Sequence, residues 1–169
     1  MERLARIVGD LLALARADAA EAPADDLDLR ELVVGRVEAW SALAAERGVE
    51  LAVALAGRPR ARAGRERLDQ VLDNLLSNAL EASPEGGTIR VESCDDGGWV
   101  ELHVADEGPG LPPDDRDRAF DRFWRGRPGP GSGLGLAIVR RLVGIDGGEV
   151  ELRESPGGGV DAVVRLRPV

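Results

Sequence analysis

The segment Gly131-Ser132-Gly133-Leu134-Gly135-Leu136-Ala137-Ile138-Val139 joins a loop with alternate glycines to an apolar helix without a break. Glycine lacks a Cβ atom and adopts positive φ easily, so the backbone of this loop can come close to an anion. The first turn of the following helix offers N–H groups that have no partner within the helix. The segment therefore predicts a phosphate-binding loop, although a Gly-rich loop alone is equally typical of a plain turn or a helix cap.

Three further segments precede this loop in an order that suits a single ATP site. They are Asn74-Leu75-Leu76-Ser77-Asn78, then Asp106-Glu107-Gly108-Pro109-Gly110, then the aromatic pair Phe120 and Phe123. Together the four segments resemble the N, G1, F and G2 boxes of the catalytic and ATP-binding domain of bacterial sensor histidine kinases. That domain is a member of the gyrase, Hsp90, histidine kinase and MutL superfamily, and the resemblance spans most of the chain.

The resemblance implies ATP and Mg²⁺ as cofactors. Asn78 is implied as the Mg²⁺ ligand, a neutral oxygen donor for an ion that keeps most of its waters. Asp106 is implied to accept a hydrogen bond from the adenine amino group, with Gly110 letting the loop pass close to the base. The other implied nucleotide-binding residues are Gly108, Gly131, Ser132, Gly133, Leu134, Gly135 and Leu136. Standing alone, the Asn would be read as a solvated or capping side chain and the Asp as the start of a turn.

Asn74 distinguishes a kinase from an ATPase in this interpretation. In hydrolytic relatives the residue one turn before the metal-binding Asn is a glutamate that activates water, whereas an amide has no useful basicity. A transferase is favoured, with the nucleophile brought by another protein segment. Arg122 and Arg125 lie beside the predicted ATP lid and are candidates to contact the γ-phosphate, a solvated arginine being the alternative. We assign Asn74, Asn78, Arg122 and Arg125 as the catalytic residues.

The only histidine, His103, is not the phosphoacceptor in our interpretation. It lies in an alternating run, residues 100–104, where it faces away from Leu102 and Val104, so we expect a surface histidine on a strand. The only cysteine, Cys94, cannot form an internal disulfide and is expected to be a packed or half-exposed thiol in a strand.

Composition limits the class of protein. The 169 residues suffice for one full domain and an accessory element. The formal charge of −9 argues against nucleic acid as a partner. No apolar run approaches the roughly 18 residues of a membrane span, and no secretory signal follows Met1. We therefore expect a cytoplasmic chain, which is compatible with a membrane anchor elsewhere in a full-length kinase.

Periodicity predicts helices over residues 29–46 and from about residue 65 to just before Pro84, with another after the Gly-rich loop. Strands are predicted over residues 49–55, 60–63, 88–94, 99–105, 149–153 and 160–166. This order indicates an α+β fold, a two-layer α/β sandwich with a mixed, mostly antiparallel sheet and helices on one face. The resemblance implies the Bergerat-type ATP-binding fold. The predicted ATP-binding catalytic domain covers residues 29–169, after a linker at 20–28.

Residues 1–19 form a separate predicted unit. Within them, residues 2–18 carry an apolar stripe at helical spacing. They resemble the end of the second helix of the dimerisation and phosphoacceptor hairpin of histidine kinases; the alternative is an amphipathic helix that packs on its own domain. The resemblance implies three partners: the phosphoacceptor helix of a full-length kinase, a second copy in a homodimer, and a response regulator.

Several positions depart from the family pattern. After Asn78, Glu81 and Ala82 replace a basic residue and an aromatic, and the lid at residues 126–130 is short. Asp146 stands where a histidine is common, and Val160 replaces a common threonine. Our interpretation is the ATP-binding catalytic domain of a sensor histidine kinase. The alternatives are a serine kinase of the anti-sigma-factor type and a non-catalytic ATP-binding module.

Overall fold

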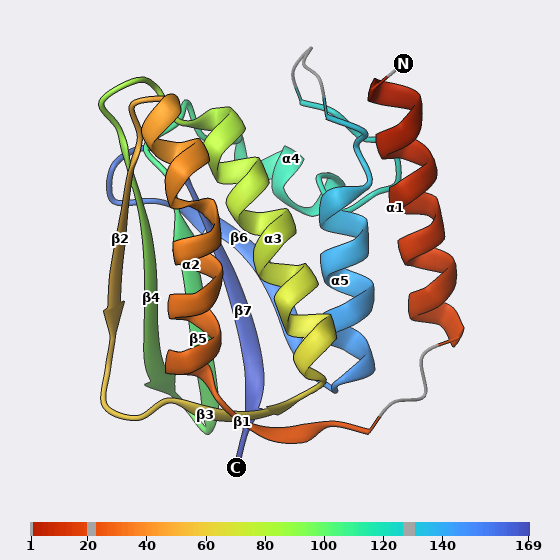
Figure 1. Cartoon of the computed structure of the whole chain (residues 1–169), viewed down its shortest axis with the longest axis vertical. Coiled ribbons are helices and arrows are strands. Elements are labelled where there is room, and N and C mark those ends of the chain that lie inside the picture. Colours follow the sequence, from red (N-terminus) through yellow and green to blue (C-terminus); the bar gives the residue numbers. More distant parts are fainter. Residues whose placement is uncertain (1, 20–22, 127–130) are drawn as a thin grey trace.

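The computed structural model describes residues 2–19, 23–126 and 131–169 (Figure 1). In chain order the helices and strands are α1 (Glu2–Ala19), β1 (Asp25–Asp28), α2 (Leu29–Glu46), β2 (Glu50–Leu55), β3 (Arg60–Ala63), α3 (Arg65–Ala82), β4 (Thr88–Asp96), β5 (Trp99–Ala105), α4 (Pro113–Arg118), α5 (Gly135–Ile145), β6 (Glu149–Glu154) and β7 (Val160–Pro168). None of these helices combines the length and the apolarity that a bilayer span demands.

The strands form one sheet in the order β1-β3-β7-β5-β4-β2, with β6 also paired to β7. Only β2 and β4 are parallel among the described pairs; the others are antiparallel. Figure 1 shows α2, α3 and α5 on one face of this sheet. The predicted α+β class, a mixed and mostly antiparallel sheet with helices on one face, is confirmed.

Local sequence signals set the ends of several elements. Asp28 caps α2, because its Oδ1 accepts a hydrogen bond of 2.9 Å from the N–H of Arg30. The β4–β5 hairpin turns at Gly97 and Gly98, whose φ values of 56° and 89° are both positive. Two positive φ values in a row define the hairpin turn whose twist matches the flanking strands. These elements were predicted because their signals lie within a few residues of the boundary.

The core lies between the helices and the sheet. The completely or almost completely buried side chains include Leu72 and Leu76 of α3, Ile89 of β4, Leu102 of β5 and Ile138 of α5. Their helical or alternating spacing follows from the period of each element. The core therefore fixes α3 and α5 side by side above the strands.

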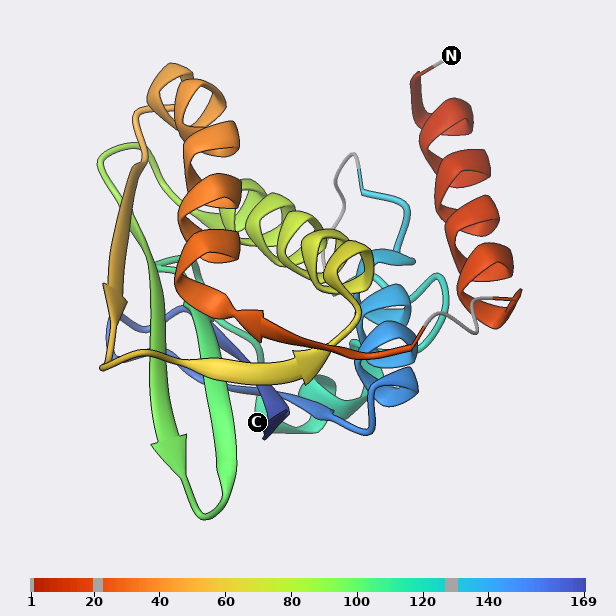
Figure 2. The same cartoon turned by 60° about the horizontal axis from the view of Figure 1, so that its bottom comes forward.

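The structure differs from the sequence analysis at two places in the fold. Residues 25–28, assigned to the linker, form the edge strand β1, which pairs antiparallel with β3 (Figure 2). Phe123 does not share a helical face with Phe120: it adopts a φ of 64° and is 57% exposed, whereas Phe120 is buried. The N–H of Phe123 donates to the carbonyl of Gly133 at 2.8 Å, so the chain leaves the helical path there.

Helix α1 lies beside α5 at the edge of the helical layer (Figures 1 and 2). Its predicted apolar stripe is only partly covered, because Leu4, Val8, Leu11 and Leu12 are 44–68% exposed. The helix is confirmed, whereas its role in a dimerisation and phosphoacceptor hairpin stays a prediction.

Candidate nucleotide-binding site

A pocket of ≈ 690 Å³ lies between α3, α5 and the end of β5. This volume lies within the range of small-molecule and cofactor sites. The predicted site residues in its wall are Asn74, Asn78, Asp106, Gly110, Arg125, Gly131, Ser132, Gly133, Gly135 and Leu136. The structure thus brings residues of three separate sequence segments to one cavity.

Three predicted residues do not line the pocket. Leu134 is buried in the core, immediately before the first residue of α5. Arg122 is exposed, and Gly108 lies beside the wall, where its N–H binds Asp106. Residues 127–130 of the predicted lid lie outside the described residues.

Asp106 follows β5 and is held by the backbone around it. Its Oδ1 accepts hydrogen bonds from the N–H groups of Gly108 at 2.8 Å and Val160 at 3.1 Å. Within the described part of the chain, Oδ2 has no hydrogen-bond partner. The side chain is only 5% exposed, and this burial raises the pKa of Asp106 although the two N–H groups oppose it. Oδ2 is therefore a preoriented acceptor at the pocket.

Glycines let the backbone close around Asp106. A Cβ on Gly110, whose φ is 72°, would lie 2.8 Å from the carbonyl oxygen of Gly158, and one on Gly108 would lie 2.7 Å from that of Ala82. A Cβ on Gly159 would overlap Asp106 itself. Sequence analysis missed Gly159, because only the long-range β5–β7 pairing brings it to the site.

The N-terminus of α5 faces the two asparagines of α3. A Cβ on Gly135 would lie 3.1 Å from Oδ1 of Asn74 and 3.6 Å from Oδ1 of Asn78. Among the described residues no side chain caps α5, since the cap residue is Leu134. Its first-turn N–H groups and its helix dipole are thus suited to an anion. Asn74 is oriented by a bond of 2.9 Å from its Nδ2 to the carbonyl of Gln70.

The Gly-rich loop contacts two distant segments. Gly133, with a φ of 75°, packs so closely on Phe123 that a Cβ would lie 2.9 Å from the Cα of Phe123. The hydroxyl of Ser132 donates to Oδ2 of Asp10 on α1 at 2.5 Å and accepts from the N–H of Leu134 at 3.2 Å. Asp10 also lines the pocket. No sequence signal identified Asp10, because the contact spans 122 positions.

Acidic groups outnumber basic ones in the described wall of the pocket. The charged residues there are Asp10, Asp73, Glu81, Asp106 and Arg125. A triphosphate bound in this setting requires additional positive charge close to its oxygens. Asn78, whose side chain is exposed to the pocket, is a suitable oxygen ligand for a divalent cation that also binds phosphate. The residues present therefore fit a nucleotide together with Mg²⁺.

His103 and Cys94 lie outside this pocket, on the opposite face of the sheet. The predicted facing of His103 is correct, and on that face the side chain is half-buried rather than fully exposed. Its side chain is 16% exposed, and its Nδ1 lies 3.0 Å from Oδ2 of Asp161. This hydrogen bond raises the pKa of His103. Cys94 is exposed and belongs to β4.

Residues 63–169 match a protein family described as histidine kinase-, DNA gyrase B-, and HSP90-like ATPase. The chain is 35% identical over 163 residues to the signal transduction histidine-protein kinase/phosphatase MprB of Mycolicibacterium smegmatis, covering 94% of this chain and 32% of that protein. It is 34% identical over 173 residues to the signal transduction histidine-protein kinase BaeS of Escherichia coli, covering 96% and 36%. The chain thus spans about one third of the length of these relatives.

Solved structures agree with these matches. A structure of the mycobacterial sensor histidine kinase MprB superposes with a TM-score of 0.74 at 31% identity, covering 86% of this chain and 99% of that one. Full-length ShkA in complex with AMPPNP superposes with a TM-score of 0.83 at 36% identity, covering 95% and 35%.

Proposed function

Because the chain belongs to the family of histidine kinase-, DNA gyrase B- and HSP90-like ATPases, we propose that it is the ATP-binding catalytic domain of a two-component sensor histidine kinase. The observation that carries this proposal is the pocket. It places a preoriented carboxylate oxygen of Asp106 at one part of its wall and the uncapped N-terminus of α5 at another.

Asp106 would select adenine. Its Oδ1 already binds two backbone N–H groups, so Oδ2 is left to accept from the exocyclic amine of the base. A base with a carbonyl oxygen at that position would place two acceptors against each other. The relative ShkA was solved with AMPPNP, an analogue of ATP, which supports this assignment.

The phosphates would bind at the N-terminus of α5, with Gly133 and Gly135 allowing close approach of the backbone. Asn78 would hold Mg²⁺, which neutralises phosphate charge when bound. Arg125 is the described basic residue in the wall and is proposed to contact the terminal phosphate.

Transfer to a histidine is favoured over hydrolysis at this site. Asn74 lies beside the start of α5, where an amide cannot deprotonate water. The acceptor would be a histidine on a separate helix, because His103 lies on the opposite face of the sheet from the pocket. A response regulator would then receive the phosphoryl group, and the full-length kinase would act as a homodimer in the cytoplasm.

Labelling with γ-labelled ATP tests this proposal. The tag-free chain is incubated with Mg²⁺, labelled ATP and a separately produced histidine-bearing hairpin from a sensor kinase relative. We expect acid-labile label on the hairpin, none on this chain, and none on a hairpin whose acceptor histidine is replaced by glutamine. Label on His103 would overturn the acceptor assignment. An unlabelled hairpin in a mixture that binds ATP would indicate the non-catalytic alternative.

A further inference from the structure

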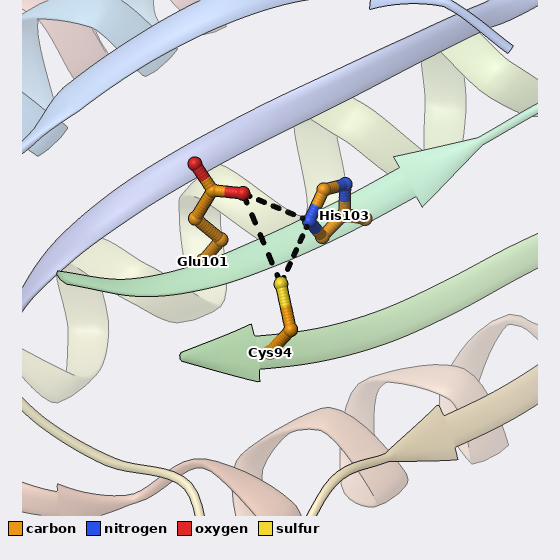
Figure 3. A group of neighbouring side chains, drawn as sticks. All are labelled: Cys94, Glu101 and His103. Atoms are coloured by element: carbon orange, nitrogen blue, oxygen red, sulfur yellow. Dashed lines mark hydrogen bonds and ion pairs between the residues drawn. The ribbon is translucent and has the colours of Figure 1, made fainter. Parts of the chain in front are cut away.

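A second group of potential ligands lies on the sheet face opposite the helices. Figure 3 shows the side chains of Cys94 on β4 and of Glu101 and His103 on β5 pointing toward one another. Cys94 is directly opposite Glu101 in the antiparallel pair, and His103 is two residues farther along β5, on the same face. None of the three lines the nucleotide pocket. Their arrangement therefore has no part in the proposed ATP site.

The three ligand atoms form a compact triangle. Glu101 Oε2 and His103 Nε2 are 3.3 Å apart, Cys94 Sγ and His103 Nε2 are 3.6 Å apart, and Cys94 Sγ and Glu101 Oε2 are 3.9 Å apart. With zinc bonds of about 2.0–2.1 Å to nitrogen and oxygen and about 2.3 Å to sulfur, tetrahedral ligands lie about 3.4–3.6 Å apart. The triangle thus matches three corners of a zinc tetrahedron with little movement.

Asp161 on β7 orients the imidazole for such a role. Its Oδ2 lies 3.0 Å from His103 Nδ1. A carboxylate can only accept, so Nδ1 carries the proton and the lone pair of neutral His103 is on Nε2, which faces Cys94 and Glu101. A carboxylate behind a histidine is the usual outer support of a metal-binding imidazole. Asp161 Oδ1 is buried without a partner among the described residues, which leaves negative charge beside the cluster.

Two arginines fix the carboxylate of Glu101. Its Oε1 accepts from Arg165 Nε at 2.8 Å and from Arg153 at 3.2 Å, which leaves Oε2 directed at the cluster, with Arg153 3.5 Å away. Both guanidinium groups also contact Glu151, so their charge is shared between carboxylates. When Cys94 is a thiolate, the negative groups outnumber the two arginines, and a divalent cation would balance the excess. The negative groups are Cys94, Glu101, Glu151 and Asp161.

We infer that Cys94, Glu101 and His103 bind one zinc ion, with water at the fourth tetrahedral position on the solvent side. The exposure of Cys94 provides the path of entry. A thiolate, an imidazole and a carboxylate together favour zinc over magnesium or calcium, which prefer all-oxygen sites. On binding, the thiol proton passes to solvent. The ion would join β4 to β5 and, through Asp161, to β7.

The experiment uses the full, tag-free chain, since a histidine tag would bind zinc itself. Zinc is titrated by calorimetry at mildly alkaline pH without nucleotide, and the rate of Cys94 alkylation is measured with and without zinc. The chain has one cysteine and one histidine, so each readout reports on a single side chain. Cobalt(II) replaces zinc in a parallel sample to detect thiolate-to-metal charge-transfer absorption.

We expect one zinc per chain and slowed alkylation. Cys94→Ser and His103→Gln should each weaken binding by at least about 100-fold, and Asp161→Asn by about 10- to 100-fold, because loss of an outer-shell partner has that effect elsewhere. The control is Glu46→Gln, which removes one exposed carboxylate at the end of α2, on the helical face of the sheet; its affinity should match the parent.

The inference is overturned if zinc does not bind, if the His103→Gln variant binds zinc as tightly as the parent, or if zinc leaves the alkylation rate unchanged. If a variant fails to fold, the parent decides: cobalt(II) without a thiolate charge-transfer band refutes the site. ADP binding measured without zinc is independent of these outcomes, so failure here leaves the proposed nucleotide site intact.

Discussion

Replacing Asp106 by Asn is the sharpest test of adenine recognition at the pocket. The amide has one oxygen, and Oδ1 of the native carboxylate already accepts from the N–H groups of Gly108 and Val160 at 2.8 and 3.1 Å. If the Asn oxygen keeps these two bonds, its NH₂ group faces the adenine amine, and donor meets donor. The variant therefore loses a hydrogen bond to a charged acceptor, which is worth about 1.5–3 kcal/mol. We expect ADP affinity to fall about 10- to 150-fold.

Calorimetry with ADP and with inosine diphosphate measures this effect. The inosine base carries a carbonyl oxygen in place of the amine, so Asp106→Asn should narrow or reverse the preference for ADP. Folding should not suffer, because burial raises the pKa of Asp106 and a neutral isostere removes the need to bury a charge. Equal affinity of parent and variant for ADP, or an unchanged preference over inosine diphosphate, would refute the role of Asp106.

Three further predictions follow from the same geometry. Asn78→Ala should abolish the Mg²⁺ dependence of nucleotide binding in calorimetry, because it removes the proposed metal ligand. Since the pKa of Asp106 is raised, its carboxylate is protonated at a higher pH than that of an ordinary aspartate. Affinity for adenosine should therefore begin to fall, as the pH is lowered, at a pH above the range in which ordinary aspartates titrate. The Asp106→Asn variant should lack that pH dependence. Arg67→Met should lower the free energy of unfolding in urea by about 3–5 kcal/mol, because it leaves the buried carboxylate of Asp146 without its ion-pair partner. The matched variant Arg65→Met loses an exposed ion pair and should change it by at most about 1 kcal/mol.

Elements with local boundary signals were predictable from the sequence. Helix α2 begins after its capping residue Asp28, α3 ends just before Pro84, and the β4–β5 hairpin turns at two glycines. Strand β1 was missed because its sequence, Asp25-Asp26-Leu27-Asp28, has almost no apolar alternation. Its extended form depends on pairing with β3, which lies more than 30 positions away.

The candidate site shows the same contrast between residues with a local sequence signal and residues placed by long-range packing. Asp106, Asn74 and Asn78 were placed from short motifs, and the structure brings them to one pocket. Asp10 and Gly159 were missed because tertiary packing brings Asp10 to the pocket and Gly159 to Asp106: α1 lies beside α5, and β7 lies beside β5. The environment of His103 was also beyond the sequence, since its partner Asp161 is 58 positions away.

Strands β5 and β7 contribute to both the proposed nucleotide site and the proposed zinc site, because successive side chains of a strand point to opposite faces of the sheet. The carbonyl of Val160 accepts from the N–H of Asp106, and the N–H of Val160 donates to Oδ1 of Asp106. The next residue, Asp161, binds His103 on the opposite face. An ion held by His103 would restrict Asp161 and, through one peptide unit, the backbone that holds the adenine acceptor. Any factor by which zinc changes ADP affinity must equal the factor by which ADP changes zinc affinity. Because the shared element is a continuous strand pair rather than a hinge, such a coupling would act through the stiffness of β5 and β7 and would require no change of fold.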